Sequence, residues 1–230
     1  MKKLGLLLLC LSLLAAIPSF ADVIIGEPPD PGNGNCFPWG CSYNAEYQQV
    51  YTHGVFPGPI LITDLEFFNT QFDNGSTQLP TGTFTISLST TSVDWNTISG
   101  NYAANLGADN TVVFTGSINQ PWTFGDTLHI VLDHPFLYDP SHGNLLLDVV
   151  GDGVSVVDFN TYFDVHSGTD YFTRVYCPGG VACGNGGTVD TGYGLVTGFS
   201  TGVATPEPAS LALLGSGLLG LAALRRKRNR

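Results

Sequence analysis

The most regular pattern in the chain is a strict alternation of apolar and polar residues over positions 83–89. Phe84, Ile86 and Leu88 fall on one side of this segment, and hydroxyl side chains fall on the other. A two-residue period predicts a strand with one buried face. Residues 127–132 and 193–199 repeat the pattern, and further strands are predicted for residues 60–68, 111–118, 144–150, 155–159 and 172–176. About eight strands are therefore expected.

Turn-forming residues separate these segments. Clusters of Gly, Asn, Asp and Pro lie between them, and no stretch of a dozen residues among them has a helical period, which disfavours parallel βαβ units. We predict an all-β domain at residues 36–199, an antiparallel two-sheet β-sandwich of jelly-roll type. A Pro- and Gly-rich stretch at residues 22–35 predicts an irregular lead-in, and residues 200–205 predict a short linker.

The N-terminal end has the composition of a secretory signal peptide. Residues 1–21 contain two lysines, then a long apolar run, then small residues at Ser19 and Ala21. This order is typical of a signal that is cleaved during export, and cleavage is expected before Asp22.

The C-terminal end predicts a membrane anchor. Residues 209–224 carry no charge, and residues 225–230 are almost entirely basic. As a helix the uncharged run would extend about 24 Å, somewhat less than a hydrocarbon core of about 30 Å, and the flanking arginines can reach outward to the interface. A basic tail stays in the cytoplasm, so residues 22–208 are expected outside it.

Three features follow one another at this end: Pro206, Glu207 and Pro208, then an apolar run with glycines, then a cluster of Arg and Lys. Together, over residues 206–230, they resemble the sorting segment of PEP-CTERM proteins. The resemblance implies recognition by an exosortase, a membrane cysteine transpeptidase, and removal of the helix and tail near the motif. It also implies a location in the cell envelope or outside the cell, with transient or permanent anchoring in the inner membrane.

Part of the predicted β domain also resembles a known module. The phrases at residues 56–60, 85–91, 106–111 and 138–148 look like a β-rich extracellular module that recurs in PEP-CTERM proteins and has no assigned activity. This resemblance concerns fold and location, and it supplies no catalytic residues.

Charge is unevenly distributed along the chain. Seven of the eight Lys and Arg residues lie in the two predicted end segments, whereas all 19 acidic residues lie between Asp22 and Glu207. Only Arg174 is basic between those ends, so the exported part has a net charge of −18 with histidine neutral. Nucleic acid is excluded as a partner because phosphate binding needs a basic surface. Mutual repulsion favours solubility, and the excess of carboxylates favours cation binding.

The excess of acids suggests two candidate metal sites. Asp148, Asp152 and Asp158 flank two glycines and predict a structural calcium ion, although their spacing differs from that of an EF-hand loop. No other cofactor is expected. The second candidate is a stretch expected to be a loop, in which Asp133 and Asp139 lie with two histidines. The alternative there is a turn in which the Asp139 side chain hydrogen-bonds to the backbone.

Four cysteines remain after removal of the signal, as two close pairs. Cys36 with Cys41 and Cys177 with Cys183 are expected to form disulfides, because an exported chain meets an oxidising compartment. Zinc is the alternative, but neither pair has the two-residue spacing typical of zinc ribbons.

Catalytic motifs are absent from the sequence. There is no nucleophile elbow, no His-Glu-x-x-His and no phosphate loop, so we expect no enzyme. The first hypothesis is an exported protein with a structural or exopolysaccharide-associated role. Trp39, Trp95 and Trp122 make a carbohydrate-binding module the first alternative, and carboxylates that could meet in space make a secreted hydrolase the second.

Overall fold

A computed structural model of the chain describes residues 22–40, 46–73, 75, 77–156, 161–177 and 186–201. These residues belong to one compact unit, Asp22–Gly202. Its regular structure is almost entirely β. The described residues outside the strands include three short 3-10 helices, η2 (His53–Val55), η3 (Tyr102–Ala104) and η4 (Pro140–His142).

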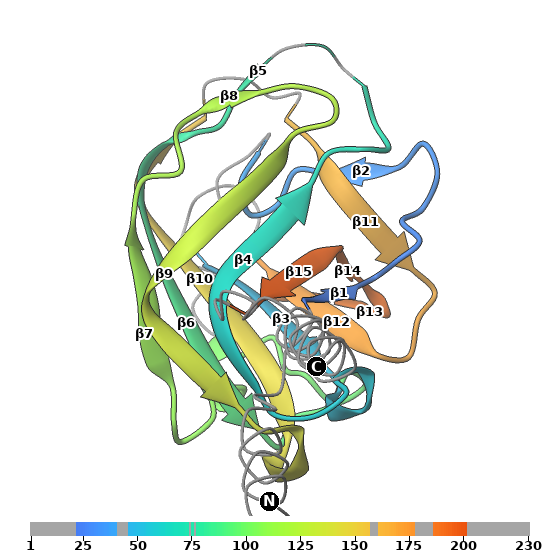
Figure 1. The fold of residues 1–230 in the computed structure, drawn as a ribbon, viewed down its shortest axis with the longest axis vertical. Coiled ribbons are helices and arrows are strands. Elements are labelled where there is room, and N and C mark those ends of the chain that lie inside the picture. The colour runs from blue at the N-terminus through green and yellow to red at the C-terminus, as the bar shows by residue number, and fades with distance from the viewer. Residues whose placement is uncertain are drawn as a thin grey trace, which may run out of the picture. The chain divides into compact units, whose positions relative to one another are not determined.

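The larger sheet has six antiparallel strands. Its order is β13 (Thr188–Thr191), β12 (Phe172–Tyr176), β3 (Glu46–Tyr51), β10 (Asn144–Ser155), β6 (Thr81–Thr91) and β7 (Thr111–Gly116). The long strands β6 and β10 pair with each other near the middle (Figure 1).

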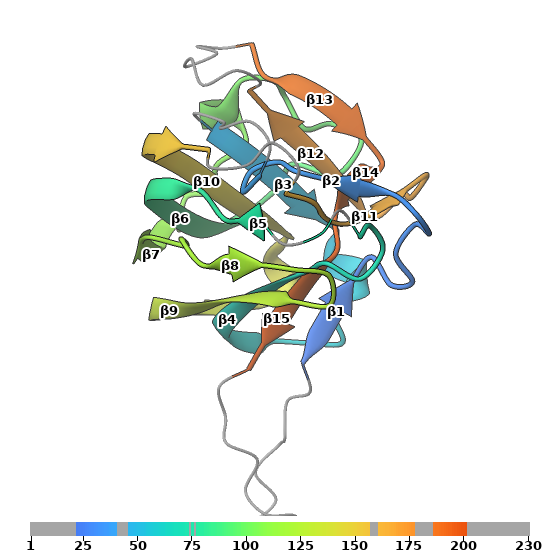
Figure 2. The same cartoon turned by 90° about the horizontal axis from the view of Figure 1, so that it is seen from above.

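The second large sheet has four antiparallel strands. Its order is β1 (Val23–Ile25), β15 (Thr197–Ser200), β4 (Ile60–Phe68) and β9 (Thr127–Tyr138). Figure 2 shows the two large sheets as two layers. Two small sheets complete the described part: β14 (Tyr193–Leu195), β11 (Phe163–Ser167) and β2 (Gly34–Asn35) form one, and β5 (Thr77–Gln78) and β8 (Pro121–Trp122) form the other.

The main hydrophobic core lies between the two large sheets. Trp39 is fully buried there, with its ring centroid 5.3 Å from that of Phe67 on β4 and 5.3 Å from that of Phe84 on β6. Tyr51 of β3 contacts Phe199 of β15 across the same gap, at 5.1 Å between centroids. Edge-to-face aromatic contacts of this kind favour close packing, so the inner faces of the two sheets are held together as a sandwich.

A second, smaller core covers the other face of the six-stranded sheet. Val50, Leu146 and Val175 project to that side and pack with Ile98 and Tyr102 from the segment between β6 and β7. Strands β3, β10 and β12 are therefore buried on both faces over part of their length.

The expectation of antiparallel all-β architecture is confirmed, with corrections. Segments 60–68 and 172–176 coincide with β4 and β12, and the alternating segment 83–89 lies within β6. The predicted irregular lead-in instead contributes β1 and β2, and the described strands form four sheets rather than two. The segment 193–199 divides at Val196 into β14 and β15: the backbone N–H of Val196 donates to the carbonyl of Asp164 in β11 (3.0 Å), whereas Thr197 pairs with Phe67 of β4 in the four-stranded sheet.

A β-bulge changes the direction of side chains between β4 and β9. Ile62 pairs with Phe136, but Asp64 pairs with Val131, so β9 advances five residues where β4 advances two. Inward-facing positions on β4 shift from Ile60 and Ile62 to Leu65 and Phe67. The bulge therefore turns Asp64 and Glu66 outward on the four-stranded sheet.

Both predicted end segments lie outside the described residues, namely the signal peptide at 1–21 and the membrane helix at 209–224. In the part that the structure describes, no helix has the length and apolar character needed to cross a membrane.

Candidate metal centre

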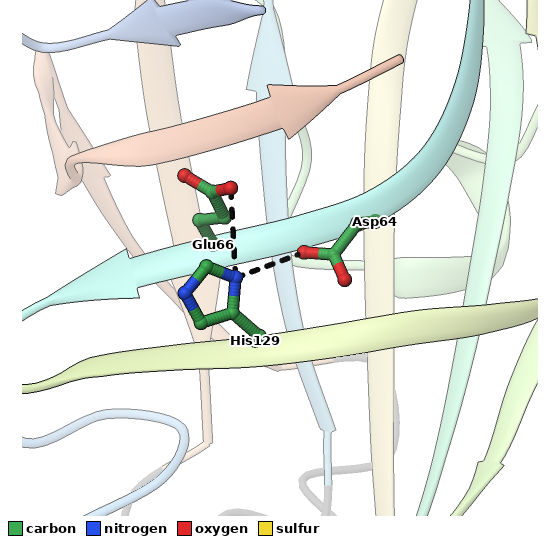
Figure 3. A group of neighbouring side chains, drawn as sticks. All are labelled: Asp64, Glu66 and His129. Atoms are coloured by element: carbon green, nitrogen blue, oxygen red, sulfur yellow. Dashed lines mark ion pairs between the residues drawn. The ribbon is translucent and has the colours of Figure 1, made fainter. Parts of the chain in front are cut away.

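Two carboxylates and one imidazole meet on the outer face of the four-stranded sheet. Glu66 of β4 lies directly opposite His129 of β9, and Asp64 lies one outward position further along β4. Nδ1 of His129 is 3.5 Å from Oδ1 of Asp64 and 3.5 Å from Oε1 of Glu66 (Figure 3). One nitrogen thus faces both acids.

The two acids are more buried than the imidazole. The exposed fractions of the side chains are 16% for Asp64, 18% for Glu66 and 57% for His129. Oδ1 of Asp64 is buried and has no hydrogen-bond partner. Burial raises the pKa of Asp64, the imidazole of His129 opposes that rise, and the carboxylate of Glu66 adds to it.

Strand β15 supports Glu66 from the other side. The Ser200 hydroxyl donates to Oε1 of Glu66 (2.6 Å), and the Thr63 hydroxyl donates to the carbonyl of Ser200 (3.1 Å). Gly198 leaves room for the acid, because a Cβ at that position would lie only 2.8 Å from Oε2 of Glu66. The carboxylate is therefore held in place by the neighbouring strand β15.

A shallow groove adjoins the imidazole. It runs between β9 and the segment joining β7 to β8, and its lining includes Phe114, Ile118, Asn119, His129 and Val131. A group bound at His129 would therefore adjoin this groove.

The predicted calcium site is not assembled by the structure. Asp148 and Asp152 lie on the single strand β10, where four residues extend about 13 Å, so a loop does not gather them. Asp148 is buried and accepts a hydrogen bond from Nε2 of Gln48 (3.2 Å). Asp158 lies outside the described residues.

The second predicted metal site is also dispersed. Asp133 lies within β9 rather than in a loop, and its carboxylate accepts from the backbone N–H of Thr115 (3.2 Å). Asp139 caps η4 by accepting from the backbone N–H of Ser141 (2.9 Å). The turn that we gave as the alternative at Asp139 is thereby confirmed.

The disulfide pairing stays a prediction. The structure describes Cys36 and Cys177, and both are buried and in the oxidised form. Cys41 and Cys183 lie outside the described residues.

The tryptophans do not form a surface platform. Trp39 and Trp122 are fully buried in the main core, and Trp95 packs partly buried against the second core. The tryptophans therefore give the carbohydrate-binding alternative no support.

The cluster of Asp64, Glu66 and His129 is not among the sites predicted from the sequence. The sequence contains a pattern that indicates such a cluster. Asp64 and Glu66 are two residues apart within one predicted strand, so they share a face, and His129 is an outward residue of another predicted strand. Among the described residues, this is the group whose His and carboxylate ligand atoms all lie within 4.8 Å of one another.

Comparison with known proteins identifies the C-terminal end. Residues 204–227 match a protein-sorting motif, which implies an exported protein with envelope-associated sorting. The motif is the PEP-CTERM protein-sorting motif, so the resemblance seen at Pro206, Glu207 and Pro208 is confirmed and processing by an exosortase is implied. No match was found among curated proteins.

Proposed function

We propose that this protein is a structural component of the cell envelope or extracellular matrix, associated with exopolysaccharide and delivered by exosortase. The observation that carries the proposal is the PEP-CTERM sorting motif at residues 204–227, joined to an all-β unit with its own core. The proposed role is non-catalytic. A carbohydrate-binding module and a secreted hydrolase are the alternatives.

The outer face of the four-stranded sheet carries exposed apolar side chains that could contact matrix components. Exposed fractions are 44% for Ile24, 69% for Val131 and 69% for Leu137. Ile24 lies on the edge strand β1, and Val131 and Leu137 lie on the opposite edge strand β9, so they offer separate apolar contact points rather than one continuous patch. We therefore place the contact with matrix components on this face.

The sorting step can be tested at Glu207. The flanking prolines hold the backbone extended and lack N–H donors, and Glu207 is the single charge between them, so replacing Glu207 by Ala is expected to block processing. Intact mass spectrometry should find a full-length, membrane-bound precursor for the variant and a product without residues 209–230 for the normal chain. Ser210→Ala, a neutral change three positions away, should be processed normally. A native chain that retains Arg230 in the membrane of exosortase-positive cells would contradict the proposal.

The contact surface can be tested separately. Val131→Ser and Leu137→Ser should each weaken co-sedimentation of the full chain with the producing cell's exopolysaccharide by about five- to tenfold, since each removes an exposed apolar contact of about 1 kcal/mol. Val112→Ser on β7 removes a comparably exposed valine from the other sheet and is the matched control. Equal losses in all three variants would argue against the assigned face.

A further inference from the structure

We propose that Asp64, Glu66 and His129 bind a divalent transition-metal cation of the zinc type on the outer face of the four-stranded sheet. Oδ1 of Asp64, Oε1 of Glu66 and Nδ1 of His129 are the protein ligands. The inference does not depend on the proposed matrix role, because it concerns the chemistry of three side chains.

The spacing of the three atoms fits ligands around one ion. Zinc binds imidazole nitrogen at about 2.0–2.1 Å and carboxylate oxygen at about 2.0–2.2 Å, so two tetrahedral ligands lie about 3.3–3.5 Å apart. Nδ1 of His129 lies 3.5 Å from each of the two carboxylate oxygens. Hydrogen bonds from nitrogen to oxygen are shorter, about 2.7–3.2 Å. The two measured spacings are longer than hydrogen bonds and are compatible with three ligands that share one ion, all of whose ligand atoms lie within 4.8 Å of one another.

The buried Oδ1 of Asp64 has an ion-pair contact with His129 at 3.5 Å but no hydrogen bond. A carboxylate oxygen that is removed from water and accepts no hydrogen bond is costly. Oδ1 of Asp64 is in that position, and the carboxylates of Glu66 and Asp22 add repulsion to it. Arg174, the sole Lys or Arg among the described residues, is paired with Asp190 on the six-stranded sheet. A bound cation would satisfy the oxygen and remove the repulsion.

The surroundings match those of metal ligands. Residues that hydrogen-bond a ligand from behind orient it toward the ion, and the Ser200 hydroxyl does this for Glu66. His129 is more than half exposed, so positions beyond the three protein ligands open to solvent. Calcium and magnesium prefer oxygen ligands, whereas a set that includes imidazole favours zinc and its neighbours.

Zinc titration of the untagged full chain in mild detergent, after treatment with chelator, tests the site. Isothermal titration calorimetry should show one zinc ion per chain bound through these residues, with a rise in melting temperature. His129→Ala, Asp64→Asn and Glu66→Gln should each lower the affinity at this site at least tenfold. His134→Ala is the matched control, because His134 is an exposed histidine on the same strand and belongs to no such group. Excess calcium should not displace the zinc.

Several results would overturn the proposal. Wild-type affinity in His129→Ala, an equal loss in His134→Ala, or an absence of binding by the wild-type chain would each do so. If one variant fails to fold by circular dichroism, the remaining two decide. The visible absorption of bound Co²⁺ provides a second measurement, and it should change with His129→Ala but not with His134→Ala. Sorting at Glu207 is independent of this outcome, so failure of either proposal can be distinguished.

Discussion

Replacing Arg174 by alanine is expected to lower the free energy of unfolding by about 3 kcal/mol, the lower end of the usual cost of breaking a buried ion pair, because the Asp190 side chain left behind is 32% exposed. Arg174 is buried on β12, and its Nε and Nη2 donate to Oδ2 of Asp190 on β13 at 3.0 and 2.7 Å. Its guanidinium carbon lies 4.3 Å from the ring centroid of Tyr193 and 4.6 Å from that of Tyr176. The substitution removes the ion pair and the packing against both rings.

Denaturant unfolding of paired variants separates these contributions. Arg174→Met keeps an apolar stem against the rings and should cost less than alanine, whereas Asp190→Ala leaves the buried guanidinium unpaired and should cost nearly as much. Asp152→Ala removes an exposed acid from the same sheet and is the control for net charge. If Arg174→Ala cost no more than Asp152→Ala, the guanidinium would not be a structural support of β12 and β13.

Raising the pH from 4.5 to 8 is expected to destabilise the domain through Glu46 and Asp148 by about 2–3 kcal/mol. This value is smaller than the full pKa shifts would give, because Glu46 is partly exposed to solvent. Burial, together with the neighbouring Asp148 carboxylate, raises the pKa of Glu46 to about 7. Burial also raises the pKa of Asp148 to about 6, against a hydrogen bond from Gln48. The folded state therefore holds protons that the unfolded chain releases, so this stability is complete below the unfolded pKa values and is lost as the pH rises toward 7.

Glu46→Gln tests this pH dependence. The amide can still donate to Asp148 but carries no charge, so at pH 8 the variant should exceed the wild type by about 1–2 kcal/mol, and near pH 4.5 the two should be equal. Asp152→Asn removes an exposed charge from the strand that carries Asp148, and it corrects for the general effect of lowering the net negative charge. Thermal unfolding across this pH range provides the measurement. Equal slopes for Glu46→Gln and the wild type would contradict the assignment.

The predictable strands are those with one buried face. In β6 the residues Phe84, Ile86 and Leu88 alternate with hydroxyl side chains, and this period is visible without a structure. β10 was harder to predict, because its first half is buried on both faces and its glycines at 151 and 153 resemble a turn. β3 was missed for a related reason, since buried Gln48 and Gln49 interrupt its apolar pattern.

The two kinds of site differ in how far apart their residues lie in the chain. The sorting motif at Pro206, Glu207 and Pro208 is contiguous, so the sequence alone was sufficient to predict it. Asp64 and His129 are brought together by the pairing of β4 with β9 and by a bulge that sets which residues face outward. Neither the partner strand nor the bulge can be derived from an alternating pattern, because the pattern describes one strand at a time.

The pairing of β1 with β15 has a mechanical consequence. Val23 lies opposite Phe199, and the backbone N–H of Thr201 donates to Asp22, so the first and last described residues meet at one edge of the β domain. Tension applied through residue 201 would act first at Ser200, the last residue of β15. The Ser200 hydroxyl is bonded to Glu66, so a pulling force on the chain would reach the carboxylate and imidazole cluster before it reached the core.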